Sequence, residues 1–341
     1  MKNMKNMKNM KKALFFLLMA AILALFLSPG GEEKIYECAE KHTAGASSHY
    51  PVEIDTYDSS GAPMHITFAH APMRIVVDEV NALETLLILG QGDKIVGAAL
   101  NTSGVSYARL KQTYPQEFAK VEPVIQNTIG REQAVALQPD FILAWKASFA
   151  PRWYGSTSWW QERGVNTYVI ATANHVLQRA TVEDECKFID DMGRIFDRQE
   201  QTDALLDDIR ASLRMDEEAV GGRAPQSVLV VEIDGGDILN YDEGWVVGDM
   251  VRRLGGHIPL TGKYIGEEEL VSCDPDVIFA AYNDEYGKHF SEHFFEGVRF
   301  NSMRAVQNGR VHFIPVEYVY TPAFKTLDGI RAIRRGMYPD E

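Results

Sequence analysis

A phrase that occurs twice at the same spacing constrains the fold of this 341-residue chain more than any other feature. The first copy, Glu132 to Asp140, reads E-x-x-V-x-x-x-P-D and is followed by Phe-Ile-Leu-Ala. The second copy, Glu268 to Asp276, has the same pattern and is followed by Val-Ile-Phe-Ala. In each copy proline stops a short helix, and the next turn leads into an apolar strand. A single joint of this kind is common, but two that agree in type, spacing and strand predict two lobes of similar construction.

Short apolar runs alternate with helical stretches on both sides of the chain's middle. We expect buried strands at residues 75–77, 94–96, 141–144, 168–170, 228–231, 277–280 and 311–314. Short helices are expected at residues 81–89 and 132–137. Strands that alternate with helices indicate a mainly parallel sheet covered on both faces. A β-hairpin with arms at residues 52–57 and 64–68 precedes this alternation.

The middle of the chain has the longer period of amphipathic helices. Thr181 and Asp184 have the spacing of a capping box, and residues 199–220 form a second long stripe. The sequence therefore predicts an α/β protein with two α/β lobes, mainly parallel sheets and a long helical connection. The expected segments are an N-terminal lobe at 52–180, a bridging helical segment at 181–222 and a C-terminal lobe at 223–341.

The N-terminus has the pattern of an export signal. Five lysines precede an unbroken apolar run of 15 residues from Ala13 to Leu27, which is shorter than the roughly 20 residues that span a bilayer. We expect a signal peptide at residues 1–30, a linker at 31–51, and a protein that acts in the periplasm or at the outer face of the cytoplasmic membrane. Cys38 follows Ile-Tyr-Glu, which disfavours a lipoprotein, while an uncleaved signal that serves as an anchor stays open.

Net charge and cysteine content argue against several classes of function. The net charge of −14 argues against a nucleic-acid partner, because phosphate binding needs clustered Lys and Arg. The three cysteines, Cys38, Cys186 and Cys273, have no zinc or redox spacing, although one disulfide is allowed. The sequence contains no compact cluster of His and carboxylates, and we therefore expect no bound metal ion or other cofactor. We expect a monomer.

Several motifs together resemble a known receptor family. The motifs are Pro72-Met-Arg-Ile-Val76, Glu84 to Gly90, Asp93 to Gly97, Leu254-Gly-Gly256, the segment 305–311 and Met337-Tyr-Pro339. The chain is similar in this respect to the helix-bridged binding proteins of ABC importers for siderophores, haem and cobalamin. The resemblance covers residues 52–339. The resemblance implies a ligand cleft between the two lobes, an iron chelate, haem or cobalamin as ligand, and an ABC permease as partner. Glu132 and Glu268 match the family's permease-docking glutamates, although both also suit the first turn of any helix.

Ligand-binding residues are expected just after the strands, because crevices in open α/β sheets lie beyond the carboxyl ends of their strands. The candidates are Asn81, Asn101, Trp145, Lys146, Trp245, Tyr264, Tyr282, Glu317 and Tyr318, with Asp78, Glu79, Thr102, His175, Glu232, Asp234 and Tyr241 in the same segments. The aromatic members suit stacking on a chelate or macrocycle. Each is also a plausible core or rim residue. Two interpretations of Lys146 and Arg152 stay open: they pair with carboxylates of the ligand, or they are solvated side chains on the surface.

Enzymatic signatures are sparse. The chain has no G-x-S-x-G, P-loop or H-E-x-x-H motif. The main expectation is therefore a binding protein and not an enzyme. Two alternatives stay open: an extracytoplasmic, chelatase-like tetrapyrrole or metallocofactor enzyme, and a surface haem scavenger without a permease.

Overall fold

The computed structural model describes residues 49–173, 175–220, 222 and 224–339, which all belong to one compact unit. The predicted signal peptide, most of the linker and Cys38 lie outside the described residues. Among the residues described, no helix combines the length and the apolar composition that crossing a membrane requires.

The N-terminal lobe contains a five-stranded, wholly parallel sheet in the order β5-β4-β3-β6-β7. Its strands are β3 (Ile75–Asp78), β4 (Ile95–Ala99), β5 (Ile125–Gln126), β6 (Phe141–Trp145) and β7 (Asn166–Ile170). Consecutive residues of β6, from Phe141 to Ala144, are completely buried. Because neighbouring side chains point to opposite faces, the sheet is covered on both faces, as the sequence predicts.

Short helices connect these strands. They are α2 (Val80–Ile88), α3 (Val105–Thr113), α4 (Pro115–Val121), α5 (Arg131–Ala136) and α6 (Thr157–Gln161), together with the 3₁₀ turns η1 (Gly92–Lys94), η2 (Glu122–Val124) and η3 (Lys146–Phe149). The predicted hairpin is present as β1 (Val52–Tyr57) and β2 (Pro63–Phe68), which form a separate antiparallel sheet. Its alternating apolar side chains, including Ile54 and Ile66, are buried, and β1 and β2 both contact β7.

The C-terminal lobe has a mixed sheet in the order β11-β9-β8-β12-β13, with β10 beside β8. Its strands are β8 (Gln226–Asp234), β9 (Asp237–Asn240), β10 (Gly256–His257), β11 (Tyr264–Ile265), β12 (Val277–Tyr282) and β13 (Val311–Pro315). The central strands β8, β12 and β13 are parallel, whereas β9 and β11 add antiparallel strands at one edge. The predicted strands at 228–231, 277–280 and 311–314 form this parallel centre.

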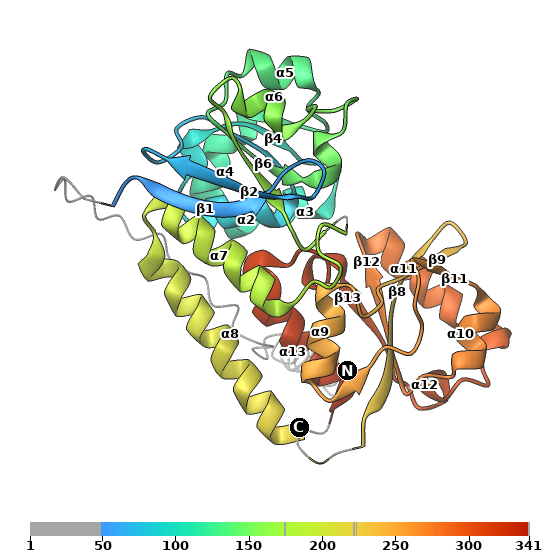
Figure 1. Ribbon diagram of the computed structural model, residues 1–341. Helices are drawn as coiled ribbons and strands as arrows, with labels where there is room; N and C mark the ends of the chain where they lie inside the picture. Colours follow the sequence, from blue (N-terminus) through green and yellow to red (C-terminus); the bar gives the residue numbers. More distant parts are fainter. Residues whose placement is uncertain (1–48, 174, 221, 223, 340–341) are drawn as a thin grey trace, which may run out of the picture. The chain divides into compact units, whose positions relative to one another are not determined.

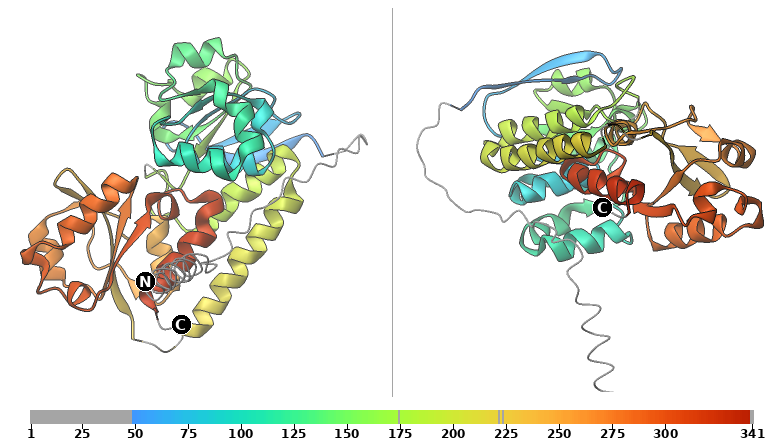
Figure 2. Two further views of the ribbon diagram at one scale, coloured as in Figure 1. Left: turned by 180° about the vertical axis from the view of Figure 1, so that it is seen from behind. Right: turned by 90° about the horizontal axis from the view of Figure 1, so that it is seen from below.

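The remaining helices are α7 (Val182–Phe196), α8 (Gln199–Val220), α9 (Val246–Arg253), α10 (Glu267–Cys273), α11 (Glu285–Phe295), α12 (Arg304–Gln307) and α13 (Thr326–Met337), with η4 (Val298–Phe300), η5 (Val316–Tyr318) and η6 (Ala323–Lys325). The long helices α7 and α8 are the two predicted amphipathic stretches, and they lie side by side as an antiparallel pair (Figures 1 and 2). The hydroxyl of Thr181 accepts a hydrogen bond from the backbone N–H of Asp184 at the start of α7, which confirms the predicted capping box.

The repeated phrase folds the same way in both lobes. The backbone N–H of Gly130 donates to Gln133 at 2.8 Å before α5, and that of Gly266 donates to Glu269 at 2.7 Å before α10. At the end of each phrase an aspartate reaches the start of the lobe's central strand. Asp140 accepts the backbone N–H of Arg74, and Asp276 accepts that of Ser227, at 2.9 and 2.8 Å. The two lobes therefore share a construction, as the repeat predicts.

Candidate functional site

The N-terminal sheet reverses its winding direction between β3 and β6. From β3 the chain adds β4 and β5 on one side, and from β6 it adds β7 on the other. The carboxyl ends of β3 and β6 are therefore the switch point at which open α/β sheets bind ligands. Asp78 ends β3 and Trp145 ends β6. Burial raises the pKa of the Asp78 carboxyl.

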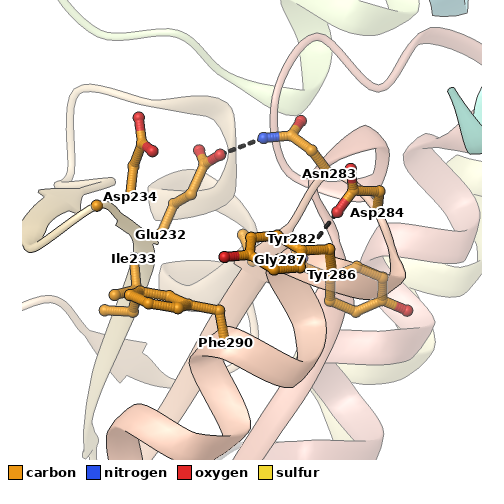
Figure 3. Close-up of a pocket in the computed structure, with 11 residues that line it drawn as sticks. Glu232, Ile233, Asp234, Tyr282, Asn283, Asp284, Tyr286, Gly287 and Phe290 are labelled. Carbon is orange, nitrogen blue, oxygen red and sulfur yellow. Dashed lines mark hydrogen bonds between the residues drawn. The ribbon is translucent and has the colours of Figure 1, made fainter. Parts of the chain in front are cut away.

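The C-terminal sheet has a cavity of about 340 Å³ at the corresponding ends of β8 and β12. Its wall comes from β8, from the end of β12 and from the first turns of α11 (Figure 3). The lining combines carboxylates with aromatic rings and consists of Glu232, Ile233, Asp234, Gly235, Ala281, Tyr282, Asn283, Asp284, Tyr286, Gly287 and Phe290. Among these residues Tyr282, Glu232 and Asp234 were predicted from the sequence.

Glu232 is the most constrained carboxylate of this cavity. The hydroxyl of Tyr241 donates to Glu232 Oε2 at 2.7 Å, and the amide of Asn283 donates to the other oxygen (Figure 3). Burial, followed by the nearby charge of Glu232, raises the pKa of Tyr241 well above its usual value, so this phenol remains a proton donor. Glu232 is therefore held in one position by two donors, one from each side of β8.

An aromatic cluster continues from Tyr241. The ring of Trp245 lies 5.3 Å from that of Tyr241 and 5.4 Å from that of Tyr320, measured between centroids. Trp145, at the end of β6 in the N-terminal lobe, meets Tyr320 edge to face at 5.7 Å. His175 contacts Trp245 at 5.1 Å. Distances in this range are those of favourable aromatic pairs, so the cluster links both lobes next to the cavity.

Polar contacts also join the lobes beside this cluster. The Asn81 amide donates to the backbone carbonyls of Glu317 and Thr321 at 3.1 and 2.9 Å. The guanidinium of Arg109 contacts the Glu317 carboxylate at 2.7 Å. Asn81 and Glu317, both predicted to bind ligand, thus contact each other's lobes. In this structure the amide nitrogen of Asn81 and the carboxylate of Glu317 serve the junction.

The backbone between Glu317 and α13 is strained. Thr321 has φ of 43° and Ala323 has φ of 47°, a region that β-branched residues rarely adopt. Their conformation is held from the other lobe and from α7. Asn81 binds the carbonyl of Thr321, and the carboxylate of Glu185 accepts the backbone N–H of Ala323 at 2.7 Å.

Two buried carboxyl groups support this junction. Glu79 caps α2 by accepting the backbone N–H groups of Asn81 and Ala82, and burial raises its pKa to about 8. Burial likewise raises the pKa of Glu185 to about 7. Both carboxyl groups hold their proton to a higher pH than usual, because the charged form would lose its hydration without gaining a neighbouring cation.

Other predicted ligand residues lie apart from this arrangement. Asn101 is exposed and accepts the backbone N–H of Ser103 within its own turn. Lys146 reaches the hairpin turn at Gly61. Tyr264 lies on the edge strand β11 with 60% of its surface exposed. Tyr318 is half-buried and packs against the C-terminal core.

Sequence reasoning missed several residues that the structure brings to the site. Asn283, Asp284, Tyr286 and Phe290 reach the cavity from the turn after β12 and from α11. Only their position after a predicted strand pointed to them. Tyr320, two residues beyond the predicted Tyr318, also joins the aromatic cluster and was missed.

The two predicted docking glutamates occupy corresponding places. Glu132 is exposed in the first turn of α5, and Glu268 is exposed in the first turn of α10. Both helices start from the matched glycine caps described above and are therefore equivalent elements of the two lobes.

A sequence model of the family described as periplasmic binding protein matches residues 75–318, which include the sheets of both lobes and the whole lining of the cavity. The chain belongs to the periplasmic binding protein family. It is a substrate-binding protein of the class that serves ABC transporters, and it is extracytoplasmic. The family match begins after the β1–β2 hairpin.

Individual proteins that are similar to this periplasmic binding protein agree with the family assignment. The ABC transporter substrate-binding lipoprotein YvrC of Bacillus subtilis, itself described as uncharacterised, is 21% identical over 336 residues, covering 95% of this chain and 96% of that protein. A periplasmic binding protein from Veillonella parvula superposes with a TM-score of 0.74 at 25% identity, over 85% of this chain and 92% of that one. An ABC-type Fe³⁺-hydroxamate transport system protein from Saccharomonospora viridis gives a TM-score of 0.67 at 20% identity, over 85% and 99% of the two chains.

The side chains that could ligate a metal ion are dispersed in the described part of this binding protein. Within the described ranges no three His, Cys, Asp or Glu side chains converge on a common point that would hold a metal ion. Cys186 and Cys273 are free thiols, so the disulfide that the sequence allows does not form between them. Burial raises the pKa of Cys186 to about 12, which makes it a packing residue and a poor nucleophile.

Proposed function

We propose that this periplasmic binding protein captures a ferric hydroxamate chelate and delivers it to an ABC permease. The cavity beside Glu232 and the adjoining aromatic cluster are the observation that carries the proposal. Together they offer flat apolar surface with fixed polar groups, the usual composition of a small-molecule site. Haem and cobalamin are the competing ligands.

The charge of the cavity favours hydroxamates over other iron chelates. Glu232, Asp234 and Asp284 line it, and its wall contains no Lys or Arg. Three monoanionic hydroxamates neutralise Fe³⁺, whereas three catecholates leave a complex of charge −3. Carboxylates next to a trianion would repel it, and they would instead suit a neutral or cationic chelate. The name of the Saccharomonospora viridis relative agrees with this choice.

The polar groups of the cluster also suit a chelate with exposed oxygen atoms. The indole N–H of Trp145 is buried and has no hydrogen-bond partner among the described residues. An unused buried donor is costly, so a ligand acceptor at this position would gain a full hydrogen bond. Trp145 and Trp245 would then stack on or border the bound chelate.

Direct binding tests the choice of ligand. Quenching of tryptophan fluorescence is measured with a ferric trihydroxamate, a ferric tricatecholate, haem and cyanocobalamin. We expect the trihydroxamate to bind at one equivalent and about 100-fold more tightly than the tricatecholate, a difference of about 2.8 kcal/mol. Equal or tighter binding of the tricatecholate, haem or cyanocobalamin would refute the hydroxamate assignment.

The receptor role differs from an enzymatic one in what happens to the ligand. The relatives are substrate-binding transport proteins, and we infer that this chain likewise performs no chemistry. A receptor returns its ligand unchanged after release. A chelatase-like enzyme would convert tetrapyrrole and metal to product over many turnovers, and such turnover would contradict the inference.

Delivery to a permease is proposed to use Glu132 and Glu268. Their exposed, equivalent positions suit docking onto two basic pockets of a permease, with charge-assisted contacts that set orientation. In the native host, Glu132→Ala together with Glu268→Ala should abolish uptake of the chelate while its affinity stays unchanged. Glu162→Ala, at a side chain that is 74% exposed, is the control. Normal uptake by the double variant would favour a haem scavenger that works without a permease.

The domain limits and export remain part of the same proposal. Residues 1–30 would direct export, residues 31–51 would separate the folded body from the membrane, and the lobes at 52–180 and 223–341 would be joined by 181–222. The protein would act as a monomer. Mass spectrometry of the protein from its native membrane and periplasmic fractions would show whether residues 1–30 are removed.

A further inference from the structure

Helix α11 carries two histidines one turn apart. His289 and His293 are four positions apart, and Glu292 directly precedes the second. The sequence His289-Phe-Ser-Glu-His293 has the order H-x-x-E-H, the reverse of the H-E-x-x-H pattern that the chain lacks. Side chains four residues apart lie on the same face of a helix, with about 5–6 Å between Cβ atoms. Two imidazoles at this spacing can share one ion.

Each imidazole is oriented by a carboxylate three positions further along the chain. The Nδ1 atom of His289 lies 2.9 Å from Glu292 Oε2, and that of His293 lies 3.3 Å from Glu296 Oε2. When Nδ1–H donates to a carboxylate, Nε2 keeps its lone pair, which is the arrangement that metal-binding histidines use. The imidazoles are 74% and 88% exposed, so both Nε2 atoms are open to solvent.

The charge around the pair suits a cation. Glu285 lies one turn before His289 on the same face of α11, and Asp284 caps the helix. Glu292 and Glu296 complete an acidic surround. Lys288 is the neighbouring cation on this helix, and its ammonium group lies 5.9 Å from the ring of Tyr282.

We propose that α11 binds one divalent transition-metal ion between the Nε2 atoms of His289 and His293. Imidazole ligands suit Cu²⁺, Ni²⁺ and Zn²⁺, with Cu²⁺ the strongest. Because no third His, Cys, Asp or Glu of the described residues converges there, water completes the coordination sphere and the ion exchanges readily. This site is separate from the proposed chelate site and does not depend on it.

The ion would act on one wall of the cavity. Tyr286, Gly287 and Phe290 line the cavity from the same turns of α11 (Figure 3). An ion that bridges positions four residues apart holds that stretch in helical form. The bound metal therefore stiffens the turn that presents Phe290, and it raises the thermal midpoint of unfolding.

Isothermal titration of the full chain without an affinity tag tests the site, with CuSO₄, NiCl₂ and ZnCl₂ as probes. We expect one ion per chain with Cu²⁺ bound most tightly, and at least a tenfold loss of affinity in both His289→Ala and His293→Ala. His70→Ala, at an exposed histidine in the loop after β2, is the matched control and should bind as the native chain does. Electron paramagnetic resonance of the Cu²⁺ form should show two nitrogen ligands.

Two results would overturn the assignment. One is the absence of saturable binding of any of the three ions. The other is binding that survives in the double variant His289→Ala, His293→Ala, which would place the ion elsewhere. Both histidines are exposed, so the variants are expected to fold, and circular dichroism checks this. Binding of the ferric chelate is measured separately, so failure of one proposal leaves the other intact.

Discussion

Arg109 contacts Glu317 at 2.7 Å and also contacts Glu84 at 2.9 Å, so that one guanidinium joins α2 and α3 of the N-terminal lobe to η5 of the C-terminal lobe. Glu84 is almost completely buried, and it also accepts the hydroxyl of Tyr114 at 2.9 Å. Arg109 is therefore the principal cation that balances two carboxylates at the lobe junction.

Replacing Arg109 should destabilise the protein. Arg109→Met leaves the buried carboxylate of Glu84 with less positive charge to balance it. Loss of one partner from a buried ion pair costs about 3 kcal/mol. Lys111→Met on the same helix removes an exposed contact with Glu122 and should have no measurable effect. Urea denaturation of both variants provides the comparison. Equal unfolding midpoints for the two would show that the junction does not depend on Arg109.

The close packing of α13 on η5 leads to a second prediction. A Cβ atom at Gly329 would lie 2.2 Å from the backbone oxygen of Tyr318, which cannot move without shifting the chain. Gly329→Ala should therefore cost roughly 2–3 kcal/mol of stability. Gly287→Ala in α11 is the control, because its nearest neighbour would be 3.4 Å away and alanine favours the helix. Equal stability of the two variants would contradict the packing argument.

The local parts of the fold could be predicted from the sequence. The Pro-Asp joints at Asp140 and Asp276 involve contiguous signals, namely a helix, a proline and an apolar strand. The structure adds that both aspartates bind the start of a neighbouring strand. The ends of strands could also be located from the sequence, and the residues predicted there include Trp145, Tyr282 and Glu232, which lie at the candidate site.

The contacts between the lobes could not be predicted in the same way. Asn81 meets Thr321 across 240 residues, and Arg109 meets Glu317 across 208, so that no local period records either pair. Glu317 was expected in the ligand site for its position after β13, yet its charge is balanced by Arg109. The direction in which α11 presents Phe290 depends likewise on how that helix packs on β8 and β12.

Glu185 makes stability depend on pH. Its pKa is about 7 in the folded protein and lies near 4.5 in the unfolded chain, so the folded state binds the proton more tightly. The resulting stabilisation is complete below pH 4.5 and is lost as pH rises to 7, by at most about 3 kcal/mol at 1.36 kcal/mol per unit. Glu79 acts in the same direction toward pH 8.

Glu185→Gln isolates the contribution of that carboxyl group. Glutamine keeps an oxygen that can accept the backbone N–H of Ala323 but does not titrate. Urea denaturation at pH 5, 6, 7 and 8 should show that the native protein loses stability more steeply than the variant. Parallel curves for the two proteins would mean that Glu185 is not protonated in the folded state near neutral pH.

The bond between Tyr241 and Glu232 offers a test of the candidate ligand site itself. Tyr241→Phe keeps the ring that packs against Trp245 but removes the donor at 2.7 Å, so that Glu232 retains only Asn283. A charged acceptor that loses one donor becomes less well positioned, and we expect about tenfold weaker binding of the ferric trihydroxamate, or about 1.4 kcal/mol. Tyr264→Phe, at the exposed tyrosine of β11, should bind normally. If both variants bind as tightly as the native protein, the chelate does not contact Glu232, and the cavity at β8 and β12 is not its site.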